Sequence, residues 1–96
     1  MSAEGDPAAG GVAEQCREIY ARLGKQLESA GSGLQSVVKT TEFVTPTGLT
    51  AYRKTADVRR EVFAAPYPAA TGVICDRLVH PDAQIAVEVV AIRDQA

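Results

Sequence analysis

The sequence predicts an α+β domain in which two helices cover one face of a small mixed β-sheet. Three observations lead to this fold class. Apolar residues recur at helical spacing after residue 11, β-branched residues dominate three later segments, and a second helical pattern separates two of those segments. A chain of 96 residues holds one domain at most, so residues 1–96 are taken as a single domain.

The first helix is expected over residues 12–30, after a Gly-, Ala- and Pro-rich loop at residues 1–11. Its apolar face is defined by three- and four-residue steps through Val12, Cys16, Ile19, Tyr20, Leu23, Leu27 and Ala30. Glu14 lies in the first turn, where an acidic side chain suits the helix dipole. Gly31 is expected to end the helix as a C-terminal glycine.

A β-branched, Thr-rich stretch at residues 34–45 predicts a strand that closes at Pro46. A second helix is expected to follow it, with Thr47 or Thr50 as the N-cap and an apolar side that reaches Phe63. Prolines at 66 and 68 are expected to stop that helix.

Residues 70–78 and 85–92 predict two further strands, joined by a turn at His80-Pro81-Asp82. A sheet of three strands lies at the small end of the usual range. Its exposed edges would favour pairing with another chain.

The charge pattern argues against nucleic-acid binding, because the net charge is −2 and a basic stripe is absent. The densest basic segment contains Arg53, Lys54, Arg59 and Arg60, with acidic residues interleaved at helical spacing. This arrangement predicts a solvated helix face.

No metal, cofactor or membrane partner is expected. Cys16, Cys75 and His80 are too few and too scattered for a zinc site, and the two cysteines are interpreted as small core residues. No apolar run approaches the length of a membrane span, and no signal peptide is visible. A cytoplasmic location is therefore expected.

Glu88 is the sole charged residue in an otherwise apolar final strand, whose two faces both look buried. Burying a carboxylate without a partner costs several kcal/mol, so its pKa should rise or a partner must meet it. One interpretation is structural: an ion pair, for example with Arg77, or an exposed position near a subunit edge. The other is functional: a carboxylate in a cleft that holds a water or exchanges a proton with a ligand.

Two segments resemble the RidA/YjgF family. Residues 27–45, LESAGSGLQSVVKTTEFVT, are similar to the family pattern L-x-x-A-G-x-x-L-x-x-V-V-K-T-T-x-F-x-T, and residues 85–93, IAVEVVAIR, are similar to its closing strand. The resemblance implies a chorismate-mutase-like subunit that forms a homotrimer, with ligand clefts between subunits. It also implies hydrolysis of reactive enamines and imines to 2-keto acids and ammonia, without metal or organic cofactor. Some relatives carry an endoribonuclease label, and others act in secondary metabolism.

The resemblance assigns roles to four residues. The family's water-positioning glutamate matches Glu88, and its Pro-x-Arg-Ser motif falls on residues 68–71. Ala70 therefore stands where the family has a substrate-binding arginine, so the bidentate clamp on a substrate carboxylate is missing. Thr71 keeps a hydroxyl, and Gly72 is expected to widen the pocket.

The front of the chain departs from the family, which begins with a β-hairpin and a turn. Residues 1–4 are expected to be the tail of that turn, and the hairpin is missing, so that either the start is truncated or the strands come from another polypeptide. Two functions remain open. The chain is a divergent hydrolase, deaminase or tautomerase of a small metabolite that uses Glu88, or a non-catalytic small-molecule-binding or assembly module of the same fold. An RNA-cleaving function gains no support from the acidic charge.

Overall fold

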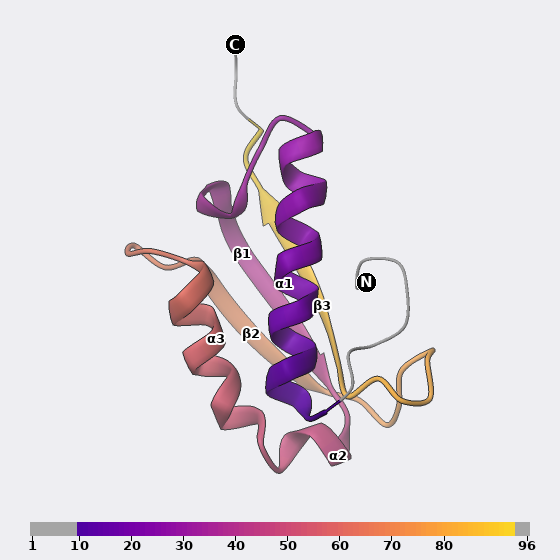
Figure 1. The fold of residues 1–96 in the computed structure, drawn as a ribbon. Helices are drawn as coiled ribbons and strands as arrows, with labels where there is room; N and C mark the ends of the chain where they lie inside the picture. Colours follow the sequence, from indigo (N-terminus) through magenta and orange to yellow (C-terminus); the bar gives the residue numbers. More distant parts are fainter. Residues whose placement is uncertain (1–9, 94–96) are drawn as a thin grey trace.

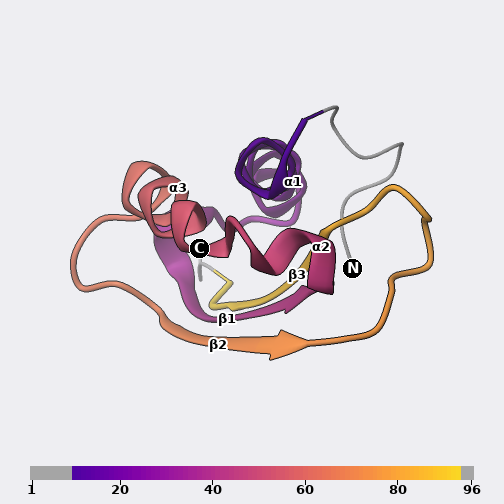
Figure 2. The same cartoon turned by 90° about the horizontal axis from the view of Figure 1, so that it is seen from below.

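The computed structural model describes residues 10–93. A mixed three-stranded sheet has the order β2-β1-β3, with β1 (Val37–Val44) at the centre. Strand β2 (Ala69–Ile74) runs parallel to β1, and β3 (Ile85–Ala91) runs antiparallel to it. All helices lie on one side of this sheet in the part of the chain that is described (Figures 1 and 2). The predicted α+β class is confirmed.

Helix α1 (Val12–Ser29) forms as predicted from its apolar period. The Glu14 carboxylate caps the start of this helix: it accepts a hydrogen bond from the backbone N–H of Gly11, at 3.1 Å. Its end is followed by Gly31, whose φ of +82° is costly for a residue with a side chain. Val12, Cys16 and Tyr20 are fully buried on the face that meets the sheet.

The second predicted helix is wrong in detail, because the chain breaks it into three pieces. These are α2 (Pro46–Leu49), the 3₁₀-helix η2 (Tyr52–Lys54) and α3 (Thr55–Val62). Thr45, rather than Thr47 or Thr50, is the N-cap of α2, and its hydroxyl accepts from the Gly48 N–H at 3.3 Å. The physical reason is that Pro46 suits the first helical position, which makes the residue before it, Thr45, the cap.

The strand limits also differ from the prediction. Residues 34–36 form a 3₁₀-helix, η1 (Leu34–Ser36), before β1 begins, and β2 ends at Ile74 rather than at residue 78. The turn at residues 80–82 is confirmed by a hydrogen bond from the Ala83 N–H to the His80 carbonyl.

The core lies between the sheet and the helices. On β1 the buried side chains Thr40, Glu42 and Val44 face α1 and α3. Strand β3 adds Ile85 and Val87 to this layer. The expectation that β3 is buried on both faces is wrong for the single chain, because helices cover only one side of the sheet and Val90 is exposed.

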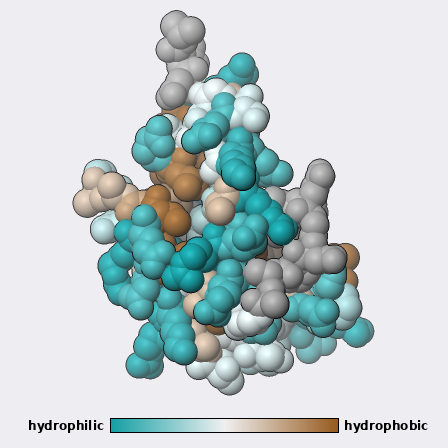
Figure 3. Space-filling view, in the orientation of Figure 1, coloured by the Kyte–Doolittle hydropathy of each residue, from teal (hydrophilic) through white to brown (hydrophobic). Residues whose placement is uncertain are grey.

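The helix-bearing surface is mostly hydrophilic, as Figure 3 shows. A hydrophobic patch is visible at the upper left of this view, where η1 and the end of α3 lie. The opposite face of the sheet and strand β2 are exposed: every residue of β2 is exposed, including Val73 and Ile74. No helix within residues 10–93 has the length and hydropathy needed to cross a membrane.

Candidate functional site

Glu88 and Thr71 lie on the sheet face that carries no helix. Both residues are paired in register with Thr41, Glu88 from β3 and Thr71 from β2. They are therefore two strand spacings apart, roughly 10 Å. Glu88 is exposed, and within residues 10–93 no ion pair joins it to Arg77. Of the structural interpretations, the exposed position on an edge strand agrees with the fold.

Ala70 and Gly72 lie on the other face of β2, toward the helices. Ala70 pairs with Thr40, and Gly72 pairs with Glu42. A single chain therefore brings Glu88 and Thr71 to one face and Ala70 and Gly72 to the other. The four residues do not form one site within the subunit.

A cavity of about 290 Å³ opens beside Ala70. Its wall contains Thr40 and Ala70 from the sheet, Arg59 and Arg60 from α3, and the rings of Phe63 and Tyr67. The Thr40 hydroxyl oxygen is fully buried and has no hydrogen-bond partner among the described residues. An unsatisfied buried hydroxyl is costly, and this one belongs to a residue that lines the cavity.

A buried carboxylate next to this cavity was missed by the sequence reasoning. Glu42 is 1% exposed and accepts three hydrogen bonds. The donors are the hydroxyl of Tyr20 at 2.7 Å, the hydroxyl of Tyr52 at 2.6 Å, and Nη1 of Arg59 at 2.6 Å. Three donors and no acceptor suit an ionised carboxylate, which accepts only. We call these four residues the Glu42 cluster.

The cluster changes the acid–base properties of its members. Burial, followed by the charge of Glu42 and the hydrogen bond to it, raises the pKa of Tyr20. Burial, followed by the hydrogen bond to Glu42 and then the charge of Glu42, raises the pKa of Tyr52 to about 12. Burial alone would lower the pKa of Arg59, but the charge and hydrogen bond of Glu42 outweigh it and raise that pKa. Both tyrosines therefore stay neutral and Arg59 stays charged near pH 7.

Arg59 corrects the expectation of a solvated basic face. Arg60 pairs with Asp57 in solvent, as expected of such a face. The side chain of Arg59, in contrast, turns toward the sheet and is only 24% exposed. The sequence carried a weak signal for the inward position of Arg59. Glu42 and Val44 are two residues apart in a strand and so lie on the same face, and a carboxylate that is buried there needs a cation.

Gly72 does not leave empty space, contrary to the expectation of a wider pocket. A Cβ at residue 72 would lie 2.9 Å from the Tyr52 hydroxyl oxygen, so this tyrosine fills the position. The missing side chain at residue 72 is what allows Tyr52 to reach Glu42.

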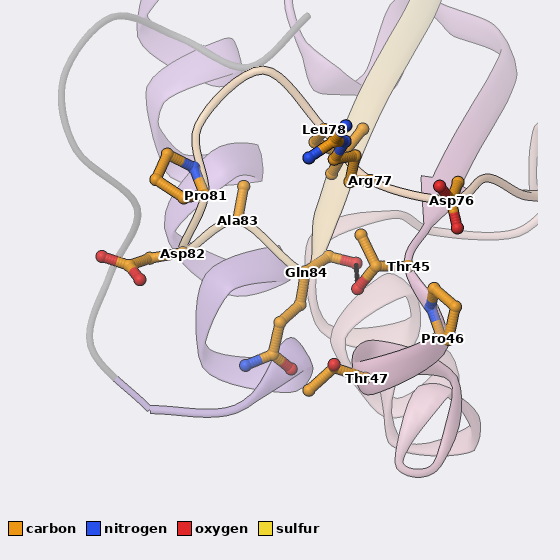
Figure 4. Close-up of a pocket in the computed structure, with 10 residues that line it drawn as sticks. All are labelled: Thr45, Pro46, Thr47, Asp76, Arg77, Leu78, Pro81, Asp82, Ala83 and Gln84. Carbon is orange, nitrogen blue, oxygen red and sulfur yellow. Dashed lines mark hydrogen bonds between the residues drawn. The ribbon is translucent and has the colours of Figure 1, made fainter.

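A second cavity, of about 370 Å³, lies just beyond the C-terminal end of β1. Figure 4 shows its wall, in which Thr45 and Gln84 are joined by a hydrogen bond and Arg77 comes from the loop after β2. Arg77 therefore belongs to this wall. Within residues 10–93, no three His, Cys, Asp or Glu side chains are grouped so that they could hold a metal ion.

The family model described as Endoribonuclease L-PSP matches residues 2–93. The chain belongs to this family. The prediction of a RidA/YjgF-type member is thereby confirmed. No curated protein matches the chain.

Solved structures share the fold of this Endoribonuclease L-PSP family member. A YjgF/YER057c/UK114 family member from Mycobacterium tuberculosis has 26% identity and a TM-score of 0.80, over 88% of this chain and 70% of that one. A putative endoribonuclease from Thermotoga maritima has 25% identity and a TM-score of 0.81, over 95% and 69%. RidA from an Antarctic Psychrobacter has 24% identity and a TM-score of 0.78, over 91% and 68%.

Proposed function

We propose that this chain binds a small organic metabolite in the cavity beside Ala70, in an assembly of identical subunits. The observation that carries the proposal is the Thr40 hydroxyl, which is buried in the cavity wall without a partner. A ligand atom that hydrogen-bonds to this hydroxyl would remove the cost of leaving it unsatisfied. The rings of Phe63 and Tyr67 supply apolar surface for the rest of the ligand.

The assembly that we propose is a homotrimer, as the family resemblance implies. Its physical support is surface that a single chain leaves uncovered: β2 is an exposed edge strand, and Val73, Val90 and Ile92 are exposed. Edge strands and apolar sheet faces are usually covered by another chain. In such an assembly the cavity beside the edge strand β2 would lie close to a neighbouring copy.

A hydrolase or tautomerase acting on an enamine- or imine-type intermediate is the second candidate function. It is favoured by Glu88, an exposed carboxylate in the same row as the hydroxyls of Thr41 and Thr71. Because Glu88 and the cavity lie on opposite faces of the sheet, this function requires Glu88 to act on a ligand held with the help of a neighbouring subunit. The side chain of Ala70 offers such a ligand no hydrogen-bond donor.

Ligand binding is tested by NMR with ¹⁵N-labelled protein and a panel of small alicyclic and aromatic molecules. We expect shifts of the amide signals of Thr40, Phe63 and Tyr67, and we expect Ala70→Phe to abolish them by filling the cavity. Ala21→Phe, on the exposed side of α1, is the size-matched control and should leave binding intact. A panel that shifts none of the cavity signals would overturn the proposal.

The enzymatic candidate is tested by trapping 2-iminopropanoate, made in situ, with semicarbazide. We expect no acceleration of its hydrolysis by the wild-type chain, and new activity in Ala70→Arg if the rest of the site is intact. Acceleration that survives Glu88→Ala would remove Glu88 from any catalytic role. A native mass spectrum tests the trimer, and a clean monomer would contradict it.

A further inference from the structure

We propose that Arg59, anchored by Glu42, binds the carboxylate of a singly charged ligand in the cavity beside Ala70. This inference rests on the proposed ligand site and names both its charged contact and the class of ligand. Arg59 lies on helix α3 and lines the same cavity as Ala70 of β2. It would supply the cation that residue 70 does not.

The anchoring of Arg59 leaves one edge of its guanidinium available. Nη1 donates to Glu42 at 2.6 Å and to the Thr55 hydroxyl at 2.9 Å. Nε and Nη2 donate to no other described residue. These two nitrogens form the edge that binds a carboxylate with two parallel hydrogen bonds. A guanidinium that is fixed at Nη1 can present this edge with little further loss of side-chain freedom.

The tyrosines hold the anchor itself in place. The hydroxyl of Tyr20 binds one oxygen of Glu42 and the hydroxyl of Tyr52 binds the other. The Arg59 guanidinium also lies 5.8 Å from the centre of the Tyr52 ring, within the range of a cation–π contact. Glu42 is thus a positioning residue, which acts on the ligand through Arg59.

The charges around the cavity favour a single carboxylate over a group with more negative charge. The wall contributes two guanidinium groups, and each already lies beside a carboxylate, Arg59 beside Glu42 and Arg60 beside Asp57. A dianion such as a phosphate monoester or a dicarboxylate would place more negative charge next to these carboxylates than a monocarboxylate does. A single carboxylate would gain two charge-assisted hydrogen bonds from Arg59, while an apolar body contacts Phe63 and Tyr67.

The test compares cyclohexanecarboxylate with cyclohexanecarboxamide, which have nearly the same shape and differ in charge. Dissociation constants are measured by NMR titration on the full chain. We expect the wild type to prefer the acid by about tenfold or more, as charge-assisted bidentate hydrogen bonds predict. Arg59→Lys keeps a cation for Glu42 but lacks the planar fork, so the preference should fall to nearly none. Arg53→Gln, at an exposed arginine outside the cavity wall, is the matched control and should keep the preference.

A double variant guards against a folding defect. Glu42→Gln with Arg59→Gln removes both charges together and keeps groups that can hydrogen-bond to each other. It should bind the amide as the wild type does and lose its preference for the acid. If the wild type binds acid and amide equally, the role of Arg59 is wrong but the ligand site stands. If neither compound shifts the cavity signals, both this inference and the ligand site are wrong.

Discussion

Tyr52 and Gly72 depend on each other for space. The hydroxyl of Tyr52 lies 2.9 Å from the point where a side chain at residue 72 would begin. Gly72 is paired in register with Glu42, the residue to which that hydroxyl donates. The glycine at residue 72 is therefore structurally linked to the buried carboxylate at residue 42.

Gly72→Ala should destabilise the wild type by about 1 kcal/mol, because the overpacking cost exceeds the usual gain of replacing a strand glycine. In a Tyr52→Phe background the same change should be neutral or stabilising, since the nearest remaining ring atom lies 3.5 Å away. The free energy of unfolding in urea is measured for the wild type, the two single variants and the double variant, which together form a double-mutant cycle. Equal effects in both backgrounds would show that the two residues do not compete for space.

Tyr20→Phe should lower the free energy of unfolding by about 1.5–3 kcal/mol, because it removes a buried hydrogen bond to a charged group. Tyr67→Phe is the matched control: Tyr67 is 55% exposed, and its change should stay within about 0.5 kcal/mol. Both values come from chemical denaturation at one protein concentration. Similar losses for the two variants would remove the special role of the Tyr20 hydroxyl.

Stability should decrease at alkaline pH, partly through Tyr52. The folded state raises the pKa of Tyr52 from 10.0 to about 12, mainly by burial. Between these values the unfolded chain has released the proton that the folded chain keeps, so the contribution is complete below the lower value and is lost as the pH rises toward the upper one. Denaturation at several pH values should give a shallower decline for Tyr52→Phe than for the wild type. Parallel declines would contradict the linkage.

The two cysteines should differ in reactivity. Cys16 is fully buried, and burial, followed by the charge of Glu42, raises the pKa of its thiol to about 12. Because the thiolate is the reactive form, Cys16 should resist Ellman's reagent in the native state at mildly alkaline pH. Cys75 is half-buried and should react. In the Cys75→Ser variant, Ellman's reagent should detect no thiol in the native protein and one thiol, that of Cys16, in guanidinium chloride. Rapid labelling of the native variant would contradict the prediction.

Much of the fold could be predicted because its signals are local. The apolar period of α1, its end at Gly31, and the apolar run of β3 each lie within one short segment. The break between α2 and α3 could not be predicted, since it brings Tyr52 to Glu42, a contact with another element. The helix propensity of a segment does not reflect contacts that its side chains make with another element.

The candidate site was predictable only in part. Glu88 was expected in a buried setting because both faces of its strand are apolar, a pattern that does not distinguish a core from a surface between subunits. Glu42 was overlooked because it lies among polar residues of β1, where its burial depends on the helices above. Arg59 was assigned to solvent by its charged neighbours, although its own position faces the sheet.

The Glu42 cluster joins α1, β1, η2 and α3 at one carboxylate. Breaking any of its contacts exposes the same buried charge, so these elements should open together rather than one by one. In native-state hydrogen exchange their slowest amides should share one opening free energy. The amides of β2, an edge strand without a buried side chain, belong to a different unit and should exchange with a lower opening free energy in the single chain.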